Sequence, residues 1–164
     1  MNEDVSLELK FGDLCHDTLA ENMPHELSFD ENKDYETWRA QVKEKLSELL
    51  RMKIIEKNAC PFNMKIEEDI QMDGYRRIRF VFESEKNAFV PCYLCIPDTG
   101  KEKYPLVITQ QGHSTGFHNS IGEPKNKGEE EYALGRGQFA VQAVKRGYIS
   151  VAIEQRAMGE RRPL

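Results

Sequence analysis

The sequence has 164 residues, of which 39% are hydrophobic and 31% are charged, and its formal net charge is −5. A chain of this length can bury one ordinary core, which predicts a single globular unit. The acidic balance excludes a nonspecific nucleic-acid binder, because such a protein needs a basic stripe to displace counterions from phosphates. The N-terminal sequence MNEDVSLELK lacks the basic and apolar regions of an export signal, and no apolar run is long enough to span a bilayer. We therefore expect a soluble cytoplasmic protein with neither nucleic-acid nor membrane partners.

The N-terminal third predicts an arm followed by an amphipathic helix. Residues 1–30 have weak periodicity and are expected to form an extended arm or an irregular helix. From Asp34, a good N-cap candidate, apolar side chains recur at three- and four-residue steps: Tyr35, Trp38, Val42, Leu46, Leu49 and Leu50. This apolar stripe is expected to dock on the chain's own domain, and a partner-binding helix is the alternative.

Three strands are predicted in close order after this helix. The first, YRRIRFVFES, alternates apolar and basic residues and predicts a half-solvated antiparallel strand with Ile78, Phe80 and Phe82 on one face. NAFVPCYLCIP follows across a short turn and completes a hairpin. PLVITQQ is a short apolar run, typical of a strand buried on both faces.

A long polar segment over residues 112–137 separates the third strand from the next helix. It is rich in glycine and holds two histidines, and unstructured segments of this length are usually functional or disordered. GQFAVQAVKRGY then predicts a helix that stops at Gly147, and YISVAIEQ predicts a second buried strand. Strand, loop, helix and strand in this order make a parallel βαβ crossover, so the predicted fold class is α/β.

Four cysteines without an export signal are expected to be reduced thiols. One alternative is a zinc site, because Cys92, Cys95, His113 and His118 have a C-x2-C…H-x4-H spacing. The strand predicted around both cysteines opposes this, since positions three apart on a strand point to opposite faces. We therefore predict buried structural cysteines, with no metal and no cofactor.

The βαβ segments also resemble a known family. YPLVITQQGHSTGFHNSIGE followed by AVQAVKRGYISVAIEQRAMGER is similar to the third strand, oxyanion loop, first helix and fourth strand of α/β-hydrolases, with the closest likeness to acetyl xylan esterases and dienelactone hydrolases. The likeness covers about residues 60–164. Two positions depart from it: Gln111 stands where many relatives have histidine, and Ala157 where a glycine is common.

The resemblance implies an incomplete α/β-hydrolase fold of the three-layer αβα type. Its elements would be an N-terminal helix and an antiparallel β-hairpin that leads into the parallel βαβ unit. We expect an arm and helix over residues 1–59, and the N-terminal part of the hydrolase domain, with strands 1–4 and the first crossover helix, over residues 60–164.

Residues 112–116 match the G-x-S-x-G pattern of a nucleophile elbow, with Ser114 at its centre. An elbow serine is followed at once by a helix, whereas the sequence here continues as FHNSIGEPKNKG, with a proline and several glycines. Glycines after a buried strand also suit a loop that aims backbone N–H groups at an oxyanion. The resemblance places Gly112 and His113 in that loop, with the His113 N–H as donor. Ser114 as nucleophile, or a loop without catalytic part, are the alternatives.

Three further residues are candidates for the substrate pocket. His118 would line it, and Arg156 and Glu160 follow the last strand at the carboxyl edge of the sheet, where ligands of open α/β sheets bind. The resemblance implies that the segment containing Arg156, Glu160 and Arg161 mostly braces the floor of the active site through ion pairs and hydrogen bonds.

In α/β-hydrolases the triad residues come in the order Ser, Asp or Glu, His, and the serine follows the strand after the one that ends near Glu154. This sequence ends at Leu164. We therefore expect the N-terminal part of a larger serine-type ester hydrolase that acts on small-molecule esters. Alone, it is expected to be inactive and to self-associate through an exposed sheet. The alternatives are a small complete hydrolase that uses Ser114, and a non-enzymatic module that binds zinc or is completed by a partner chain.

Overall fold

The computed structural model describes residues 11–112 and 116–163. Its contacts divide the chain into two compact units, Met1–Lys53 and Ile54–Leu164, which are described separately. None of the helices in the described ranges combines the length and the apolar character that a membrane span needs.

The N-terminal unit holds two helices, α2 (Phe11–Asn22) and α3 (Tyr35–Leu49). As predicted, α3 begins after Asp34, whose Oδ2 accepts a hydrogen bond from the Thr37 N–H at 2.8 Å. Trp38 ties α3 to the preceding turn, because its Nε1 donates to the Leu27 carbonyl at 2.9 Å and the Phe29 ring packs edge-on at 5.0 Å. A short helix, α4 (Met52–Lys57), spans the division between the units.

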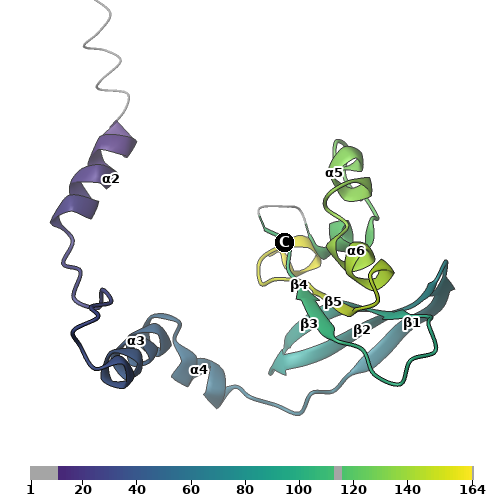
Figure 1. Ribbon diagram of the computed structural model, residues 1–164, viewed down its shortest axis with the longest axis horizontal. Helices are drawn as coiled ribbons and strands as arrows, with labels where there is room; N and C mark the ends of the chain where they lie inside the picture. The colour runs from purple at the N-terminus through teal and green to yellow at the C-terminus, as the bar shows by residue number, and fades with distance from the viewer. Residues whose placement is uncertain (1–10, 113–115, 164) are drawn as a thin grey trace, which may run out of the picture. The chain divides into compact units, whose positions relative to one another are not determined.

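The C-terminal unit is built on a five-stranded mixed sheet (Figure 1). The spatial order of its strands is β1 (Lys65–Met72), β2 (Tyr75–Glu85), β3 (Ala88–Pro97), β5 (Ile149–Ile153) and β4 (Leu106–Thr109). β4 and β5 are parallel, and the other neighbours are antiparallel. The predicted hairpin (β2 and β3) and the predicted parallel unit (β4 and β5) are both confirmed, and β5 lies between β3 and β4.

The turns explain why the first three strands form a meander. Asp73 and Gly74 connect the paired residues Met72 and Tyr75, and Gly74 has a φ of 77°, a conformation that glycine adopts without steric cost. The next turn uses Asn87 at a φ of 65°, a conformation that asparagine tolerates better than most residues. Strand β1 was not predicted from the sequence, although its Asp-Gly turn is a strong hairpin signal.

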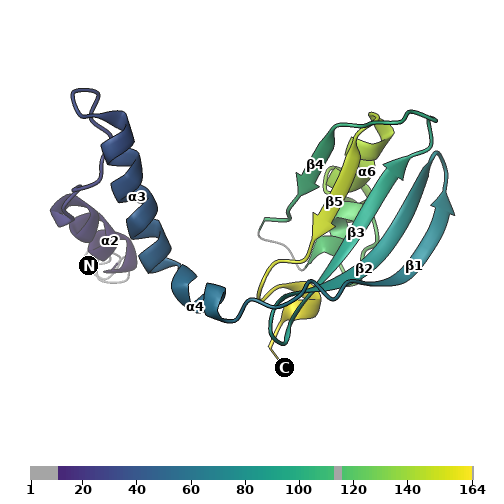
Figure 2. The same ribbon diagram turned by 90° about the horizontal axis from the view of Figure 1, so that it is seen from below.

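One face of the sheet is covered by α6 (Phe139–Lys145) (Figure 2) and the 3₁₀ segment η1 (Phe117–Ile121), and α5 (Glu130–Leu134) packs on η1. As predicted, α6 is followed by Gly147, which has a φ of 83°. The core between these layers consists of Tyr75, Tyr93, Cys95, Phe117, Ile121, Ala140, Val144 and Ala152.

Two predictions for this unit were wrong in part. The basic face of β2 was expected in solvent, yet Arg77 is buried, with its guanidinium 5.3 Å from the Tyr93 ring centroid and its Nη1 2.5 Å from Glu123 Oε1. The segment over residues 112–137 was expected to be a loop, yet it contains η1 and α5. The two differences are linked, because η1 packs its Phe117 ring against Tyr93 on the face of the sheet that holds Arg77.

Candidate functional site

The candidate site lies where the parallel strands β4 and β5 end. Their register pairs Leu106 with Ile149 and Thr109 with Ala152, so both strands finish at the same edge of the sheet. Gln111 and Gly112 leave β4 there, and Glu154 and Gln155 leave β5. The carboxyl edge of parallel strands is the usual ligand site of open α/β sheets.

Gln111 connects this edge to the segments that surround it. Its side chain is 3% exposed. Its Nε2 donates to Ser120 Oγ at 2.6 Å and to the Gly137 carbonyl at 3.1 Å, and its Oε1 accepts from Tyr132 Oη at 3.3 Å. Its own carbonyl accepts a hydrogen bond from Gln155 Nε2. Gln111, the residue before Gly112 of the predicted oxyanion loop, is therefore held in place by hydrogen bonds through both its side chain and its carbonyl.

Gly112 itself is exposed, and a Cβ placed on it would meet none of the described residues within 4 Å. Its backbone is therefore open to a ligand. The other two residues predicted in this loop, His113 and Ser114, lie outside the described residues. The N–H donor assigned to His113 and the alternative role of Ser114 as nucleophile both stay predictions.

Glu154, the first residue after β5, organises the other side of the edge. It is 1% exposed, and its carboxylate accepts hydrogen bonds from the Phe117 N–H at 3.2 and 3.3 Å and from the Glu160 N–H at 3.3 Å. Burial raises the pKa of Glu154, and these two N–H groups oppose the shift. One carboxylate thus joins the start of η1 to the turn after β5.

The turn after β5 approaches this carboxylate closely. A Cβ on Gly159 would lie 1.9 Å from Glu154 Oε2, and the residue has a φ of 47°, so glycine is required on both counts. Ala157 has a φ of 63°, the left-handed region that side chains other than glycine rarely adopt. The departure from the family resemblance at Ala157, where a glycine is common, therefore falls on a strained residue.

His118 is buried in η1 and paired with an acid. Its Nε2 lies 3.0 Å from Glu129 Oε2, and its side chain is 3% exposed. Glu129 also accepts hydrogen bonds from the N–H groups of Lys125 and Asn126, at 2.9 and 2.8 Å. Burial alone would raise the pKa of Glu129, but the hydrogen bonds from Asn126, His118 and Lys125 lower it to about 2. The predicted role of His118 in lining a substrate pocket stays a prediction.

Arg156 and Glu160 both form ion pairs with β2. Arg156 Nη2 contacts the Glu85 carboxylate, and Glu160 Oε2 lies 2.6 Å from Arg79 Nη2. Glu160 Oε1 also contacts Lys125 Nζ at 2.9 Å. Burial alone would lower the pKa of Arg79, but hydrogen bonds to Glu160, Tyr93 and Glu67 raise it. These pairs fasten the turn after β5 to the sheet, and a direct role of either residue in a substrate pocket stays a prediction.

The cysteines proposed as zinc ligands lie on opposite faces of an unbroken strand. Cys95 pairs with Ser150 and belongs to the core that faces α6. Cys92 lies three positions earlier on the same strand, so its side chain points to the other face, and it pairs with Ile153. Burial raises the pKa of the Cys92 thiol to about 12 and that of the Cys95 thiol to about 11, which disfavours the thiolate that binds zinc. Over residues 11–112 and 116–163, no three potential metal ligands come together.

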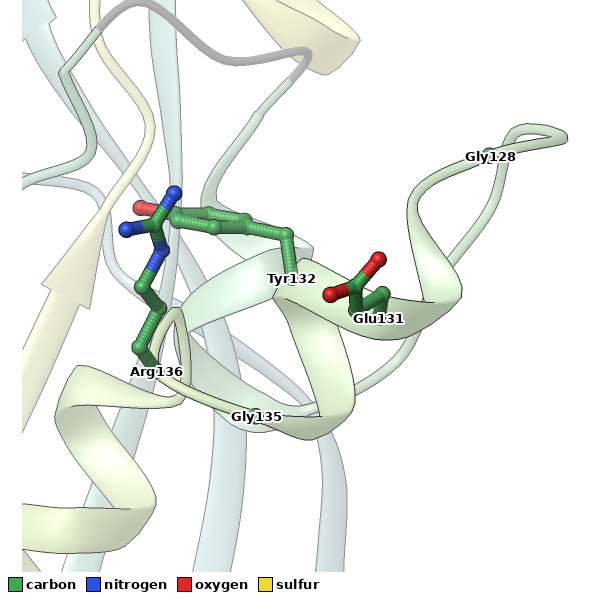
Figure 3. A pocket seen from close by; sticks show the side chains of 5 residues that line it. All are labelled: Gly128, Glu131, Tyr132, Gly135 and Arg136. Atoms are coloured by element: carbon green, nitrogen blue, oxygen red, sulfur yellow. The ribbon is translucent and has the colours of Figure 1, made fainter.

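A pocket of about 560 Å³ opens beside α5 (Figure 3). It is lined by Gly128, Glu131, Tyr132, Gly135 and Arg136. The Arg136 guanidinium lies 5.8 Å from the Tyr132 ring centroid, and the Tyr132 hydroxyl reaches Gln111. The pocket wall is therefore joined to the end of β4.

Sequence reasoning missed four residues that organise this edge: Gln111, Glu129, Tyr132 and Glu154. Glu154 carried a usable signal, since an acidic residue directly after a buried parallel strand lies at the ligand-binding edge. Gln111 is a polar residue that follows β4 at the same edge, and it was noted only as a departure from relatives. Glu129 and Tyr132 carried none, because they reach the edge through folding of a polar segment that has no clear periodicity.

The chain was compared with known proteins. The model of the Abhydrolase family matches residues 13–164. A similar solved structure is that of a candidate acetyl xylan esterase from Bacteroides fragilis NCTC 9343, with a TM-score of 0.71 and 22% sequence identity. The match covers 92% of this chain and 38% of that one, so this chain spans well under half the length of its structural neighbour. No curated protein matches the sequence. Because the family model covers nearly the whole chain, the protein belongs to the Abhydrolase family, and its five-stranded sheet matches an incomplete α/β-hydrolase fold, as predicted.

Proposed function

We propose that this chain forms the oxyanion-hole side of a serine-type ester hydrolase, whose nucleophile, acid and histidine come from other polypeptide. One observation carries the proposal: buried side chains hold both ends of the segment that joins β4 to η1. Gln111 is fixed before Gly112, and the Phe117 N–H is fixed by Glu154. This segment leaves the carboxyl edge of a parallel strand, where acyl-transfer sites of this fold family are built.

The chemistry assigned to the segment is stabilisation of negative charge. The carbonyl oxygen of an ester becomes negative in the tetrahedral intermediate, and the backbone N–H of His113 donates to it. Removing one such donor typically costs about 3 kcal/mol of transition-state stabilisation. A donor helps only if it is already in place before the reaction, and the anchors at Gln111 and Glu154 serve that purpose.

The substrate class is a small acyl ester, with an acetyl ester on a carbohydrate as the first candidate. The family supports an ester hydrolase, and the structural neighbour is named for acetyl xylan. The open backbone at Gly112 supports access of a carbonyl oxygen. Acyl specificity would be set by pocket walls outside this chain.

The oxyanion role is tested by two variants of one residue in the catalytically complete enzyme. His113→Ala keeps the backbone N–H, whereas His113→Pro removes it. For 4-nitrophenyl acetate, we expect kcat of the proline variant to fall by about 100-fold or more with little change in KM, and kcat of the alanine variant to stay within about threefold.

A thermal melt of both variants separates a lost donor from a lost fold. Equal loss of kcat in His113→Ala and His113→Pro would contradict the backbone role and assign the effect to the imidazole. Full activity in a folded proline variant would contradict the oxyanion assignment altogether.

Self-association belongs to the same proposal. β4 is the edge strand of the sheet, and within this unit Leu106 and Ile108 expose 59% and 58% of their surface. An unpaired edge with apolar side chains is a template for pairing with another strand. A second copy of the chain would fill this position in the absence of other polypeptide.

A further inference from the structure

Gly116, the residue directly before η1, passes through a gap that only glycine fits. A Cβ at this position would lie 2.9 Å from His118 Nδ1, 2.9 Å from Glu154 Oε2 and 3.0 Å from the Gly159 Cα. All three separations are shorter than the ~3.5 Å at which non-bonded heavy atoms begin to pack favourably. The imidazole of His118 and the carboxylate of Glu154 therefore form two walls that fix the path of the backbone at Gly116.

The two walls are held in place by different means. Glu154 accepts hydrogen bonds from the N–H groups of Phe117 and Glu160, so the segments that it joins also fix it. His118 contacts a second side chain, because its Nε2 lies 3.0 Å from Glu129 Oε2 and both side chains are largely buried. The position of the imidazole therefore depends on Glu129.

Glu129 is itself held by the turn that precedes α5. Its Oε2 accepts from the N–H groups of Lys125 and Asn126, and its Oε1 accepts from Asn126 Nδ2 at 3.0 Å. Burial alone would raise the pKa of Glu129, but these hydrogen bonds and that of His118 lower it to about 2, so the ionised carboxylate can only accept. The proton between the two side chains therefore belongs to His118 Nε2, and Nδ1 is the ring nitrogen beside Gly116.

We infer that His118 is a positioning residue: supported by Glu129, its imidazole holds Gly116 against Glu154 and so fixes one end of the segment that carries the proposed His113 donor. The link to catalysis rests on the proposed function, whereas the hold on Gly116 does not. The imidazole neither exchanges a proton with the substrate nor contacts it. Because an oxyanion donor helps only if it is already aligned, loss of this hold should lower kcat and leave KM unchanged.

Two variants of His118 separate positioning from chemistry in the catalytically complete enzyme. His118→Leu removes the N–H that Glu129 accepts, whereas His118→Gln keeps an amide N–H at a similar reach but has no group that titrates. For 4-nitrophenyl acetate, we expect kcat of the leucine variant to fall by about tenfold or more at unchanged KM, and the glutamine variant to recover most of that loss.

Three results would overturn the inference. An equal collapse of kcat in both variants would assign acid–base chemistry to the imidazole. A raised KM would assign contact with the substrate, and an unchanged kcat in His118→Leu would leave the residue without a role. Glu129→Gln weakens the same contact from the other partner and should lower kcat about fivefold, so full kcat in a folded Glu129→Gln variant would also overturn it, even where His118→Leu does not fold.

Glu123→Gln is the matched control for general loosening of η1. Glu123 lies beyond the opposite end of η1 from Gly116, and its Oε1 pairs with the buried Arg77 Nη1 at 2.5 Å. This variant should lower the melting temperature and keep kcat within about threefold of wild type. A loss of kcat as large as that of His118→Leu would contradict a specific role of His118.

Hydrogen exchange of the chain itself, followed by mass spectrometry, tests the hold on Gly116 without catalysis. Peptides that cover residues 112–118 should exchange faster in His118→Leu than in wild type, but not in His118→Gln or Glu123→Gln, and β2 and β3 should be unchanged in all three. Unchanged exchange over 112–118 in the leucine variant would overturn the inference alone. Full activity of His113→Pro would instead overturn the proposed function, and the exchange result would still stand.

Discussion

Strand β1 and segment η1 are held in place by opposite means. Seven of the eight residues of β1 are exposed, yet the strand pairs along its whole length with β2. All five residues of η1 are buried, yet the segment makes little regular backbone bonding and depends on side chains from other elements: Gln111, Glu129 and Glu154. The pairing of β1 with β2 distributes stability over many equivalent backbone hydrogen bonds, whereas the position of η1 depends on a few side-chain contacts. Single substitutions should therefore lower the free energy of unfolding strongly around η1 and weakly on β1.

The largest effect is expected from Gly159→Ala, which places a Cβ into the carboxylate that anchors η1. Glu154 cannot move aside without giving up its backbone hydrogen bonds. We predict a loss of about 3 kcal/mol in the free energy of unfolding, measured with urea. Gly74→Ala is the matched control, because Gly74 also has a positive φ but a Cβ there meets nothing within 4 Å. It should cost only about 1 kcal/mol, and equal losses in both variants would remove the special role of Glu154.

Next comes Glu129→Gln, which keeps the shape of the side chain but removes the charge that His118 and the backbone of Lys125 and Asn126 contact. We expect a loss of about 2 kcal/mol at pH 7, measured by urea unfolding. Because the pKa of Glu129 is lowered to about 2 in the folded chain, its contribution is complete above the ordinary value of 4.5 and is lost as the pH falls from 4.5 towards 2. The difference between wild type and variant should shrink over that window, and a difference that is constant with pH would contradict this origin.

A smaller effect of opposite sign is expected at Ala157. Its φ of 63° is unfavourable for alanine and neutral for glycine, so Ala157→Gly should raise the melting temperature and stabilise the chain by about 1 kcal/mol. Most glycine substitutions destabilise by increasing the freedom of the unfolded chain. A destabilised Ala157→Gly variant would show that the turn after β5 is not strained there.

The smallest effect is expected on β1. Asp69 pairs with Arg76 across the β1–β2 ladder, but both side chains are well exposed. Asp69→Asn should leave the free energy of unfolding nearly unchanged, because solvent screens this pair, and high salt should reduce any change further. A loss as large as that of Glu129→Gln would break the contrast between the two regions.

The regular parts of the fold were largely predictable from the sequence. The Asp34 cap, the hairpin of β2 and β3 and the parallel pair β4 and β5 each follow from hydrophobic periodicity and turn residues, which act over short distances. Strand β1 was not predicted because its sequence KIEEDIQM is mostly polar, although the Asp73–Gly74 turn indicated a hairpin at this point. Its strand character comes from pairing with β2, which a local pattern does not reveal.

The site was predictable only in its position along the chain. That the ends of β4 and β5 lie at one edge follows from parallel topology, which placed Arg156 and Glu160 there, whereas Gly112 was assigned from the family resemblance. The buried hydrogen bond between Glu154 and Phe117 joins residues 37 positions apart, and the ion pair between Arg79 and Glu160 joins residues 81 positions apart. Such pairs depend on the tertiary fold, and the polar residues between them give no period from which to infer it.

The central claim is that Ser114 does not perform nucleophilic attack, and covalent labelling tests it most directly. The chain and its Ser114→Ala variant are incubated with a fluorophosphonate, and adducts are mapped by mass spectrometry after proteolysis. The account predicts no adduct at Ser114 and the same background in both proteins. Stoichiometric labelling of Ser114 that disappears in the variant would contradict it, and would make this chain a hydrolase with a nucleophile of its own.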